Sequence, residues 1–367
     1  MRVMIAGGGT GGHTSPALAI VEELRSRDPQ LDICWVGRKG SIEERVSRTA
    51  AIPFRPVRVQ GWPRAGLVSR VRALFVLAVA VLRSASYLLR FRPHLVLGVG
   101  GYVSVPAVWV AQRMKFRTVI HEQNKHLGLA NRLLAPRADA IFLSYSETGG
   151  AYPESRARIT GNPVRRGFLQ PPNRDEARKR LDLADPRVVL VTGGSQGAAS
   201  LNEAVGNMLA ASTTRNLQLL WMAGASGVAE ARRVSDRVEF PVIVYTFIDD
   251  MVTAMAAADL VVTRSGASST AELACMGRAS ILIPYPHATD DHQTENARAF
   301  SDAGAAVLLP DRELDGTSLL DCIESILNDD VRRESMEAAA RELARPGAAE
   351  AIVDHMLELV FDGCEHE

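Results

Sequence analysis

Short apolar runs rich in β-branched residues alternate with helical patterns along most of the chain. The runs predict strands at residues 2–6, 32–36, 95–98, 117–120, 140–143, 188–192, 217–222, 242–245, 260–262, 280–283 and 306–309. Because strands that alternate with helices form parallel sheets covered by helices on both faces, the pattern predicts an α/β fold.

Glycine-rich turns follow two of these strands, one in each half of the chain. Residues 7–13 read Gly-Gly-Gly-Thr-Gly-Gly-His, and residues 193–197 read Gly-Gly-Ser-Gln-Gly. Each turn is expected to open a helix whose first N–H groups and positive dipole end can face an anion. Two such half-sites predict two nucleotide-fold domains that face each other across a cleft.

Proline and glycine indicate where the domains divide. The segment Gly-Asn-Pro-Val at residues 161–164 stands just before the second α/β series. We expect an N-terminal domain at residues 1–161 and a C-terminal domain at residues 162–345. Residues 346–367 carry an apolar stripe at helical spacing, so we expect a last helix that packs back on the N-terminal domain.

Composition limits which cellular compartment and which kinds of partner we expect for this chain. The 42 Lys and Arg residues balance the 42 Asp and Glu residues, which gives no bulk attraction for nucleic acid. The four cysteines have no C-x-x-C spacing, which argues against a disulfide framework or a zinc site and fits a reducing cytoplasm. The N-terminus reads as a strand and a turn rather than as a signal peptide. The longest apolar run, residues 73–82, is shorter than the ~20 residues of a spanning helix, so no membrane crossing is expected.

The first glycine turn permits several interpretations. Gly7, Gly9 and Gly12 match the G-x-G-x-x-G pattern of a dinucleotide site. An NAD site also needs an acid at the end of the second strand, where Arg38 stands, so an NADP-dependent oxidoreductase is one alternative. A tight turn that needs glycine only for positive φ is another. His13 lies in the first turn of the predicted helix, where its cation is disfavoured, and is a candidate base for an attacking hydroxyl.

The second half carries small and hydroxylic residues where a helix begins. Residues 263–273 follow a predicted strand, and small residues there let the start of a helix approach a ligand closely. Glu272 is suited to accept both hydroxyls of a ribose, and Gln293 is suited to sugar hydroxyls. No second His or Cys stands at ligand spacing from His292, and the chain has no D-x-D triplet. We therefore expect no metal, and helix N-termini would have to stabilise a departing diphosphate.

Together these motifs closely resemble the MurG family of glycosyltransferases. The matching segments are residues 8–13, 98–102, 121–124, 161–165, 193–197, 265–272 and 292–293. The resemblance implies a GT-B fold, which consists of two Rossmann-like domains facing across a cleft. It implies inverting transfer of N-acetylglucosamine from UDP-N-acetylglucosamine to the muramyl 4-hydroxyl of undecaprenyl-diphosphate-linked muramyl pentapeptide. This step converts lipid I to lipid II in peptidoglycan synthesis. The resemblance implies no cofactor.

The resemblance also implies roles for individual residues. His13 matches the general base. The residues that match donor contacts are Thr10, Gly11, Gly12, Asn124, Arg165, Ser195, Ile248, Ala267, Ser268, Ser269, Thr270, Ala271, Glu272 and Gln293. The residues that match the acceptor site are Gly100, Gly101, Tyr102, His121, Glu122 and Gln123.

One apolar segment with flanking arginines predicts contact with a membrane surface. Its apolar residues are Leu67, Val68, Leu74, Phe75, Val76, Leu77, Val79 and Leu82, and its arginines are Arg64, Arg70, Arg72, Arg83, Arg90 and Arg92. Such a surface can bind anionic lipid, whereas a buried core helix with arginines on its wet side is the alternative. The resemblance favours a peripheral position on the cytoplasmic face of the bacterial cell membrane, with cell-wall elongation and division proteins as partners.

Two other functions stay open beside the oxidoreductase. A GT-B enzyme with a soluble acceptor would keep both glycine turns and change only the acceptor. A catalytically silent nucleotide-binding scaffold would keep nucleotide binding without turnover, against which an intact His13 argues.

Overall fold

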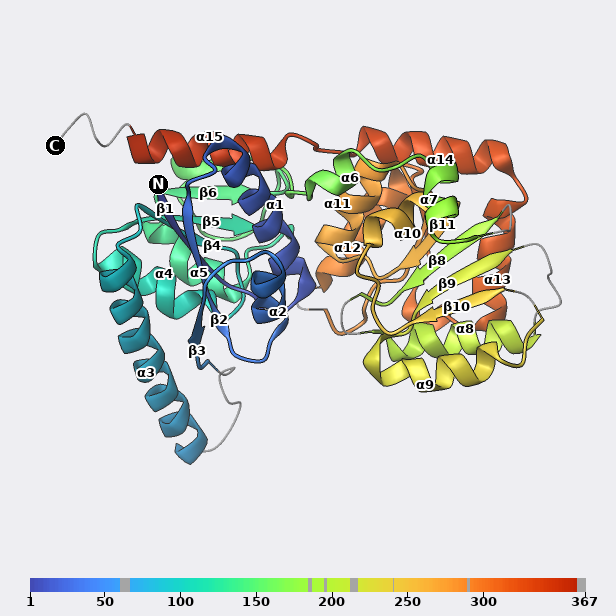
Figure 1. The fold of residues 1–367 in the computed structure, drawn as a ribbon, viewed down its shortest axis with the longest axis horizontal. Helices are drawn as coiled ribbons and strands as arrows, with labels where there is room; N and C mark the ends of the chain where they lie inside the picture. Colours follow the sequence, from blue (N-terminus) through green and yellow to red (C-terminus); the bar gives the residue numbers. More distant parts are fainter. Residues whose placement is uncertain are drawn as a thin grey trace. The chain divides into compact units, whose positions relative to one another are not determined.

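The computed structural model describes residues 1–59, 67–183, 187–194, 197–211, 217–239, 241–288 and 291–361. The chain forms two compact units, unit 1 (Met1–Arg165 with Pro346–Glu367) and unit 2 (Arg166–Arg345), each containing a parallel sheet (Figure 1). The sequence placed the division between residues 161 and 162, and the structure places residues 162–165 in unit 1.

Unit 1 contains a seven-stranded sheet in the order β3-β2-β1-β4-β5-β6-β7, with every neighbouring pair parallel. Its strands are β1 (Arg2–Ala6), β2 (Asp32–Arg38), β3 (Phe54–Val57), β4 (Leu95–Gly98), β5 (Arg117–Glu122), β6 (Ala140–Leu143) and β7 (Ala157–Ile159). Its α-helices are α1 (Gly11–Arg27), α2 (Ile42–Thr49), α3 (Leu67–Phe91), α4 (Ser104–Arg113), α5 (Leu129–Leu134) and α15 (Ala348–Phe361).

Alternate residues of the buried strands serve two cores in unit 1. Val3 and Ile5 of β1 pack with α1 and with the apolar stripe of α15. Met4 and Ala6 of the same strand pack with α3, α4 and α5 on the opposite face. This period of two is the reason why the strands are apolar throughout, since both faces are covered.

Unit 2 contains a six-stranded parallel sheet in the order β10-β9-β8-β11-β12-β13. Its strands are β8 (Val188–Thr192), β9 (Gln218–Met222), β10 (Val242–Tyr245), β11 (Leu260–Thr263), β12 (Ser280–Leu282) and β13 (Ala306–Leu308). Its α-helices are α6 (Arg166–Leu169), α7 (Arg174–Arg180), α8 (Ala199–Ala211), α9 (Gly224–Ser235), α10 (Met251–Ala257), α11 (Ala267–Met276), α12 (His292–Asp302), α13 (Gly316–Leu327) and α14 (Asp330–Glu342).

The two sheets share one strand order. Counted within each unit, the third, second, first, fourth, fifth and sixth strands are neighbours, and unit 1 adds β7 at the edge. This is the Rossmann order, in which ligands bind beyond the carboxyl ends of the first and fourth strands, where the order reverses. These switch points are β1 and β4 in unit 1, and β8 and β11 in unit 2.

Each strand predicted from the sequence is confirmed, and two edge strands were missed. β3 contains Pro56, and proline in a run argues against a strand unless the strand lies at an edge. β7 is three residues long and leaves Arg158 and Ile159 exposed, so it has no apolar run to detect. Both strands pair on one side only.

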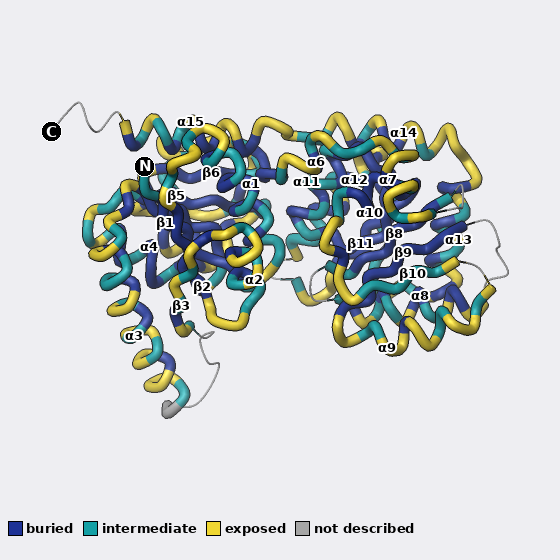
Figure 2. The backbone as a smooth tube through the Cα atoms, viewed as in Figure 1, coloured by how far each residue is buried: buried dark blue, intermediate teal, exposed yellow. Residues whose placement is uncertain are grey.

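Helix α3 leaves six large apolar side chains exposed among its described residues and projects from the rest of unit 1 (Figures 1 and 2). Leu74, Phe75 and Leu82 are each more than half exposed, whereas Ala80, Ser84 and Leu88 are buried. The interpretation of this segment as a buried core helix is therefore wrong for its exposed apolar face. The part from Ser69 to Phe91 is long and apolar enough to cross a membrane by length and composition. Arg64 and the side chains of Leu67 and Val68 lie outside the described residues.

Candidate functional site

The first glycine turn connects β1 to α1 at the switch point of unit 1. Gly7, Gly8 and Gly9 have φ values of 143°, 146° and 95°, which L residues with side chains rarely adopt. A Cβ atom at Gly7 would lie 2.6 Å from Val99 Cγ2 and 2.7 Å from the carbonyl oxygen of Gly100. The turn after β1 therefore packs directly on the turn after β4.

A buried carboxylate that the sequence analysis missed holds this turn. Glu43 of α2 is fully buried, and its two oxygens accept hydrogen bonds at 3.0 Å from the backbone N–H groups of Gly9 and Arg38. A Cβ atom at Gly8 would lie 2.4 Å from the Glu43 carboxyl carbon. The acid thus occupies a donor that a dinucleotide pyrophosphate would need, and its charge would repel that anion. This geometry argues against the oxidoreductase interpretation.

His13 lies in the first turn of α1, beside the turn that follows β4. Its Nδ1 is 2.8 Å from Thr10 Oγ1. A Cβ atom at Gly100 would lie 2.7 Å from His13 Cδ2 and 3.0 Å from His13 Nε2, and one at Gly101 would lie 2.4 Å from the carbonyl oxygen of Gly8. Close packing therefore explains why positions 100 and 101 are glycine, and neighbouring Tyr102 is 52% exposed.

The segment after β5 is held from within. Glu122 Oε1 accepts hydrogen bonds from the backbone N–H and the side-chain amide of Asn124, both at 3.0 Å. Glu122 Oε2 accepts from the Gly128 N–H at 2.8 Å and from Asn131 Nδ2 at 2.9 Å. Burial raises the pKa of Glu122, while these four donors oppose that rise. Its carboxylate orients the loop that carries Asn124.

His121 and Gln123 are also buried, at the end of β5 and just beyond it. Burial, with a smaller contribution from the charge of His13, lowers the pKa of His121 to about 4. His121 is therefore neutral at physiological pH. His121, Glu122 and Gln123 are all buried, and the contact with the acceptor that the sequence suggests for them stays a prediction.

The second glycine turn lies at the switch point of unit 2. Gly194 and Gly197 both have φ of 78°, and α8 begins two residues after the turn. Ser195, expected to contact the donor, lies outside the described residues.

The start of α11 is the second candidate anion site of unit 2. Its N-cap residue is Gly266, which has no side chain to occupy the first N–H groups of the helix. The hydroxyl of Thr270 donates to the carbonyl of Ala267 at 3.1 Å, and Ser268 is buried. At residues 267–271, backbone N–H groups are thus better placed than side-chain hydroxyls to donate hydrogen bonds to an anion. Ala271 and Glu272 follow in the second turn, where both are half-buried.

Helix α12 begins beside α11. Ser265 Oγ donates to the carbonyl of Gln293 at 2.8 Å, and Asn296 Nδ2 donates to the carbonyl of Ser265 at 3.0 Å. The side-chain oxygen of Gln293 accepts from the N–H of Tyr285 at 3.0 Å, which fixes the orientation of this amide. The structure therefore brings Gln293 to the helix start that carries Ala267.

Arg264 joins several loops of unit 2, a role that the sequence analysis did not assign. Its guanidinium is buried at the end of β11 and donates to Asp311 at 2.5 Å and to Ser200 at 2.7 Å. It also donates to the carbonyls of Ile283 and Pro284. One cation thus ties the carboxyl ends of β11 and β12 to the start of α8. Its place directly before the Ser-Gly-Ala motif was the available signal.

Two further expected residues lie at the margins of these elements. Ile248, expected to meet a base through its backbone, is buried, and its N–H donates to Met222 Sδ at 3.4 Å. Because sulfur is a weak acceptor, a ligand carbonyl would compete well for this N–H. Arg165 is half-buried at the last position of the first segment of unit 1.

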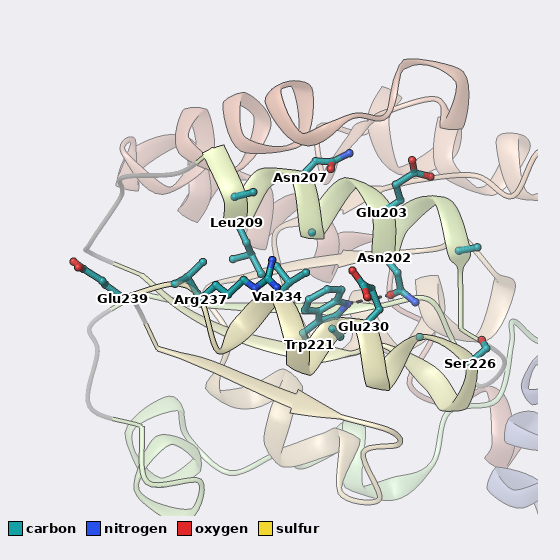
Figure 3. A pocket seen from close by; sticks show the side chains of 16 residues that line it. Asn202, Glu203, Asn207, Leu209, Trp221, Ser226, Glu230, Val234, Arg237 and Glu239 are labelled. Atoms are coloured by element: carbon teal, nitrogen blue, oxygen red, sulfur yellow. Dashed lines mark hydrogen bonds between the residues drawn. The ribbon is translucent and has the colours of Figure 1, made fainter.

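A cavity of about 860 Å³ lies elsewhere in unit 2, between α8 and α9 (Figure 3). Trp221 lines it and donates through Nε1 to Asn202 Oδ1 at 3.0 Å. None of the expected site residues lines this cavity. Among the described residues, no group of three or more His, Cys, Asp or Glu side chains is placed to hold a metal.

Two Rossmann-ordered sheets with glycine turns at their switch points are those of the GT-B fold, and two domain models identify the chain as a glycosyltransferase. Residues 3–143 match the glycosyltransferase family 28 N-terminal domain, and residues 188–352 match the family 28 C-terminal domain. The crystal structure of Acinetobacter baumannii MurG is similar with a TM-score of 0.72 and 27% identity, covering 97% of this chain and 99% of that chain. UDP-GlcNAc 2-epimerase from Neisseria meningitidis, bound to UDP-GlcNAc, shares the fold with a TM-score of 0.67 and 14% identity, covering 98% of this chain and 100% of that chain.

Curated relatives give the family. The UDP-N-acetylglucosamine–N-acetylmuramyl-(pentapeptide) pyrophosphoryl-undecaprenol N-acetylglucosamine transferase of Geobacter sulfurreducens is 38% identical, covering 97% of this chain and 98% of the relative. The transferase of the same name from Anaeromyxobacter dehalogenans is 40% identical, covering 98% of this chain and 93% of the relative. The chain belongs to this transferase family.

Proposed function

We propose that this chain transfers N-acetylglucosamine from UDP-N-acetylglucosamine to the 4-hydroxyl of undecaprenyl-diphosphate-linked muramyl pentapeptide, which makes lipid II from lipid I. The observation that carries the proposal is the pair of glycine turns at two Rossmann switch points, in a chain that matches transferases of this name over nearly its full length.

Unit 2 supplies most of the donor contacts. The first N–H groups of α11 and the turn that contains Ser195 bind the diphosphate, because helix N-termini favour anions. Glu272 accepts hydrogen bonds from the ribose hydroxyls, and Gln293 binds the transferred sugar. The N–H of Ile248 contacts the nucleotide base. Arg165 completes the donor contacts together with Asn124, whose side chain is oriented by Glu122.

The reaction is a single displacement with inversion. The muramyl 4-oxygen forms a bond to the anomeric carbon while the bond from that carbon to the UDP oxygen breaks. His13 takes the hydroxyl proton, and the charge that develops on UDP is stabilised by the helix N-terminus at Ala267. Gly11 and Gly12 contact the sugar through their backbone, and the acceptor lies along Gly100, Gly101 and Tyr102.

The lipid on the acceptor requires the enzyme to reach a bilayer, and α3 provides the surface. Exposed Leu74, Phe75 and Leu82 insert at the interface, and exposed Arg72 and Arg83 attract anionic headgroups. The second half of α3 packs on α4 and β3, and Tyr87 donates to the Pro56 carbonyl at 3.0 Å. This packing favours a helix that lies on the cytoplasmic face over one that spans, and cell-wall elongation and division proteins are the expected neighbours there.

The experiment that tests the function measures UDP release from UDP-N-acetylglucosamine with and without a short-chain analogue of lipid I. Release that depends on the analogue is the expected result. UDP binding without release, under conditions in which a known transferase of this family turns over, would overturn the activity and favour a silent scaffold. Equal release with a soluble sugar acceptor would move the acceptor assignment to another GT-B activity.

A further inference from the structure

The N-cap residue of α1 uses its side chain in an unusual way. Thr10 caps the helix by position, and its hydroxyl makes no hydrogen bond to the N–H groups of the first turn. Threonine at an N-cap ordinarily accepts a bond from the N2 or N3 backbone N–H, which stabilises the helix. Among the helix ends that the structure describes, the N-cap side chains of Asn173, Asp250, Asp315 and Asp329 accept that bond.

The Thr10 hydroxyl bonds instead to the side chain at N3. Thr10 Oγ1 lies 2.8 Å from Nδ1 of His13, and the backbone N–H of His13 donates to the carbonyl of Thr10 at 3.2 Å. His13 is thus bonded to the N-cap residue through both its ring and its backbone N–H. Because the hydroxyl is diverted from capping, its position serves the imidazole rather than the helix.

Packing fixes the other edge of the ring. A methyl group at Gly100 would lie 3.0 Å from His13 Nε2 and 3.5 Å from Gln123 Nε2, so both nitrogens lie above Gly100. A base that serves the acceptor needs an unprotonated nitrogen on the side of the turn after β4, and His13 Nε2, above Gly100, is that nitrogen. Nδ1 then carries the proton, and Thr10 Oγ1 is its acceptor.

We propose that Thr10 is a positioning residue that accepts the Nδ1 proton of His13 and so presents Nε2 as the base. The inference rests on the proposed function, because it takes His13 as the base. A hydrogen-bonded partner on the far ring nitrogen fixes both the tautomer and the orientation of a catalytic imidazole, and it stabilises the imidazolium that forms. Here a neutral hydroxyl takes the place that a carboxylate has in other sites.

The first test reads the tautomer directly. Chain labelled with ¹⁵N-histidine is compared as wild type, Thr10→Val and Thr10→Ser, and the His13 signals are identified by their loss in His13→Ala. Wild type and Thr10→Ser are expected to show a protonated Nδ1 and an unprotonated Nε2. Thr10→Val is expected to move His13 toward the Nε2-protonated form. A spectrum that Thr10→Val leaves unchanged, or an Nε2-protonated wild type, would overturn the proposal.

The second test asks whether Thr10 acts through His13. Thr10→Val should lower kcat about fivefold to tenfold and shift the acidic limb of the kcat–pH profile to lower pH, because imidazolium loses a partner. In a His13→Ala background the same change should have no further effect on kcat. An equal loss in both backgrounds, seen as a raised KM for the donor, would show a direct sugar contact and overturn the positioning role.

Two controls separate this role from folding and from the proposed function. Asp329→Ala removes an N-cap that does cap its helix, so it should lower Tm and leave the His13 spectrum unchanged. Wild-type kcat in both Thr10→Val and His13→Ala, with the tautomer shift present, would overturn the base role of His13 and leave the hydrogen bond itself established.

Discussion

The carboxylate of Glu43 accepts a hydrogen bond from the backbone N–H of Gly9 at 3.0 Å, so an acid of α2 holds the glycine turn that starts α1. The other carboxylate oxygen accepts from the N–H of Arg38, at the end of β2. Glu43 thus links the ends of two neighbouring strands. The turn that carries Thr10 and His13 depends on it.

Replacing Glu43 by Gln tests this link. A glutamine side chain has one acceptor oxygen, so one of the two N–H groups would face an NH₂ group in a buried position. We expect a loss of about 1–3 kcal/mol in the free energy of unfolding, measured by urea titration, and a fall in kcat at unchanged secondary structure. Glu154→Gln is the matched control, since this glutamate of unit 1 is exposed and should change stability by about 0.5 kcal/mol or less. Equal effects of both changes would contradict the role of Glu43.

Much of this arrangement could be predicted from the sequence, and the rest depends on long-range contacts. Apolar runs were sufficient to locate the buried strands, and the glycine-rich turns after β1 and β8 indicated both switch points. Glu43 was missed because an acid in the first turn of a helix is ordinarily explained by the helix dipole, whereas here it reaches Gly9 across the fold. Glu122 was found as part of a motif, but its role in holding Asn124 is visible only from the bonds of its two oxygens.

Gly100→Ala should impair catalysis by displacing the base. The methyl group would lie 2.7 Å from His13 Cδ2, and the backbone has φ of 91°, so both the collision and the strain act. We expect kcat to fall about 10- to 100-fold, the scale for a misplaced catalytic group. Gly40→Ala isolates the strain, because Gly40 has φ of 75° and nothing within 4 Å of the added methyl. The loss at position 100 should shrink in a His13→Ala background, and a loss that persists there would assign the glycine to acceptor binding instead.

Burial of His121 predicts a pH dependence of stability. Its folded pKa is lowered from 6.5 to about 4, so the folded state holds the neutral ring while the unfolded state binds a proton below pH 6.5. Stability is fully present above pH 6.5 and is lost as the pH falls toward 4, by roughly 3 kcal/mol. Urea titrations of wild type and His121→Gln between pH 7 and 4 check this. The variant is less stable at pH 7 and should lack this part of the slope, whereas parallel slopes would exclude His121 as its source.

The exposed face of α3 predicts membrane binding that combines apolar insertion with charge. Leu74→Ser, Phe75→Ser and Leu82→Ser together remove apolar area that is already exposed, so the fold should be retained while binding to vesicles falls. Arg72→Gln with Arg83→Gln should weaken binding to anionic vesicles by about 1 kcal/mol per charge and reduce its salt dependence, with little effect on neutral vesicles.

Val331→Ser is the matched control, since Val331 is 80% exposed on α14 and lies outside this face. Sedimentation with vesicles measures binding, and activity on a short-chain acceptor in detergent-free solution should stay at the wild-type level in all variants. Because that activity needs the site but not the bilayer, a parallel loss of both would show that α3 serves the acceptor or the fold rather than the lipid surface.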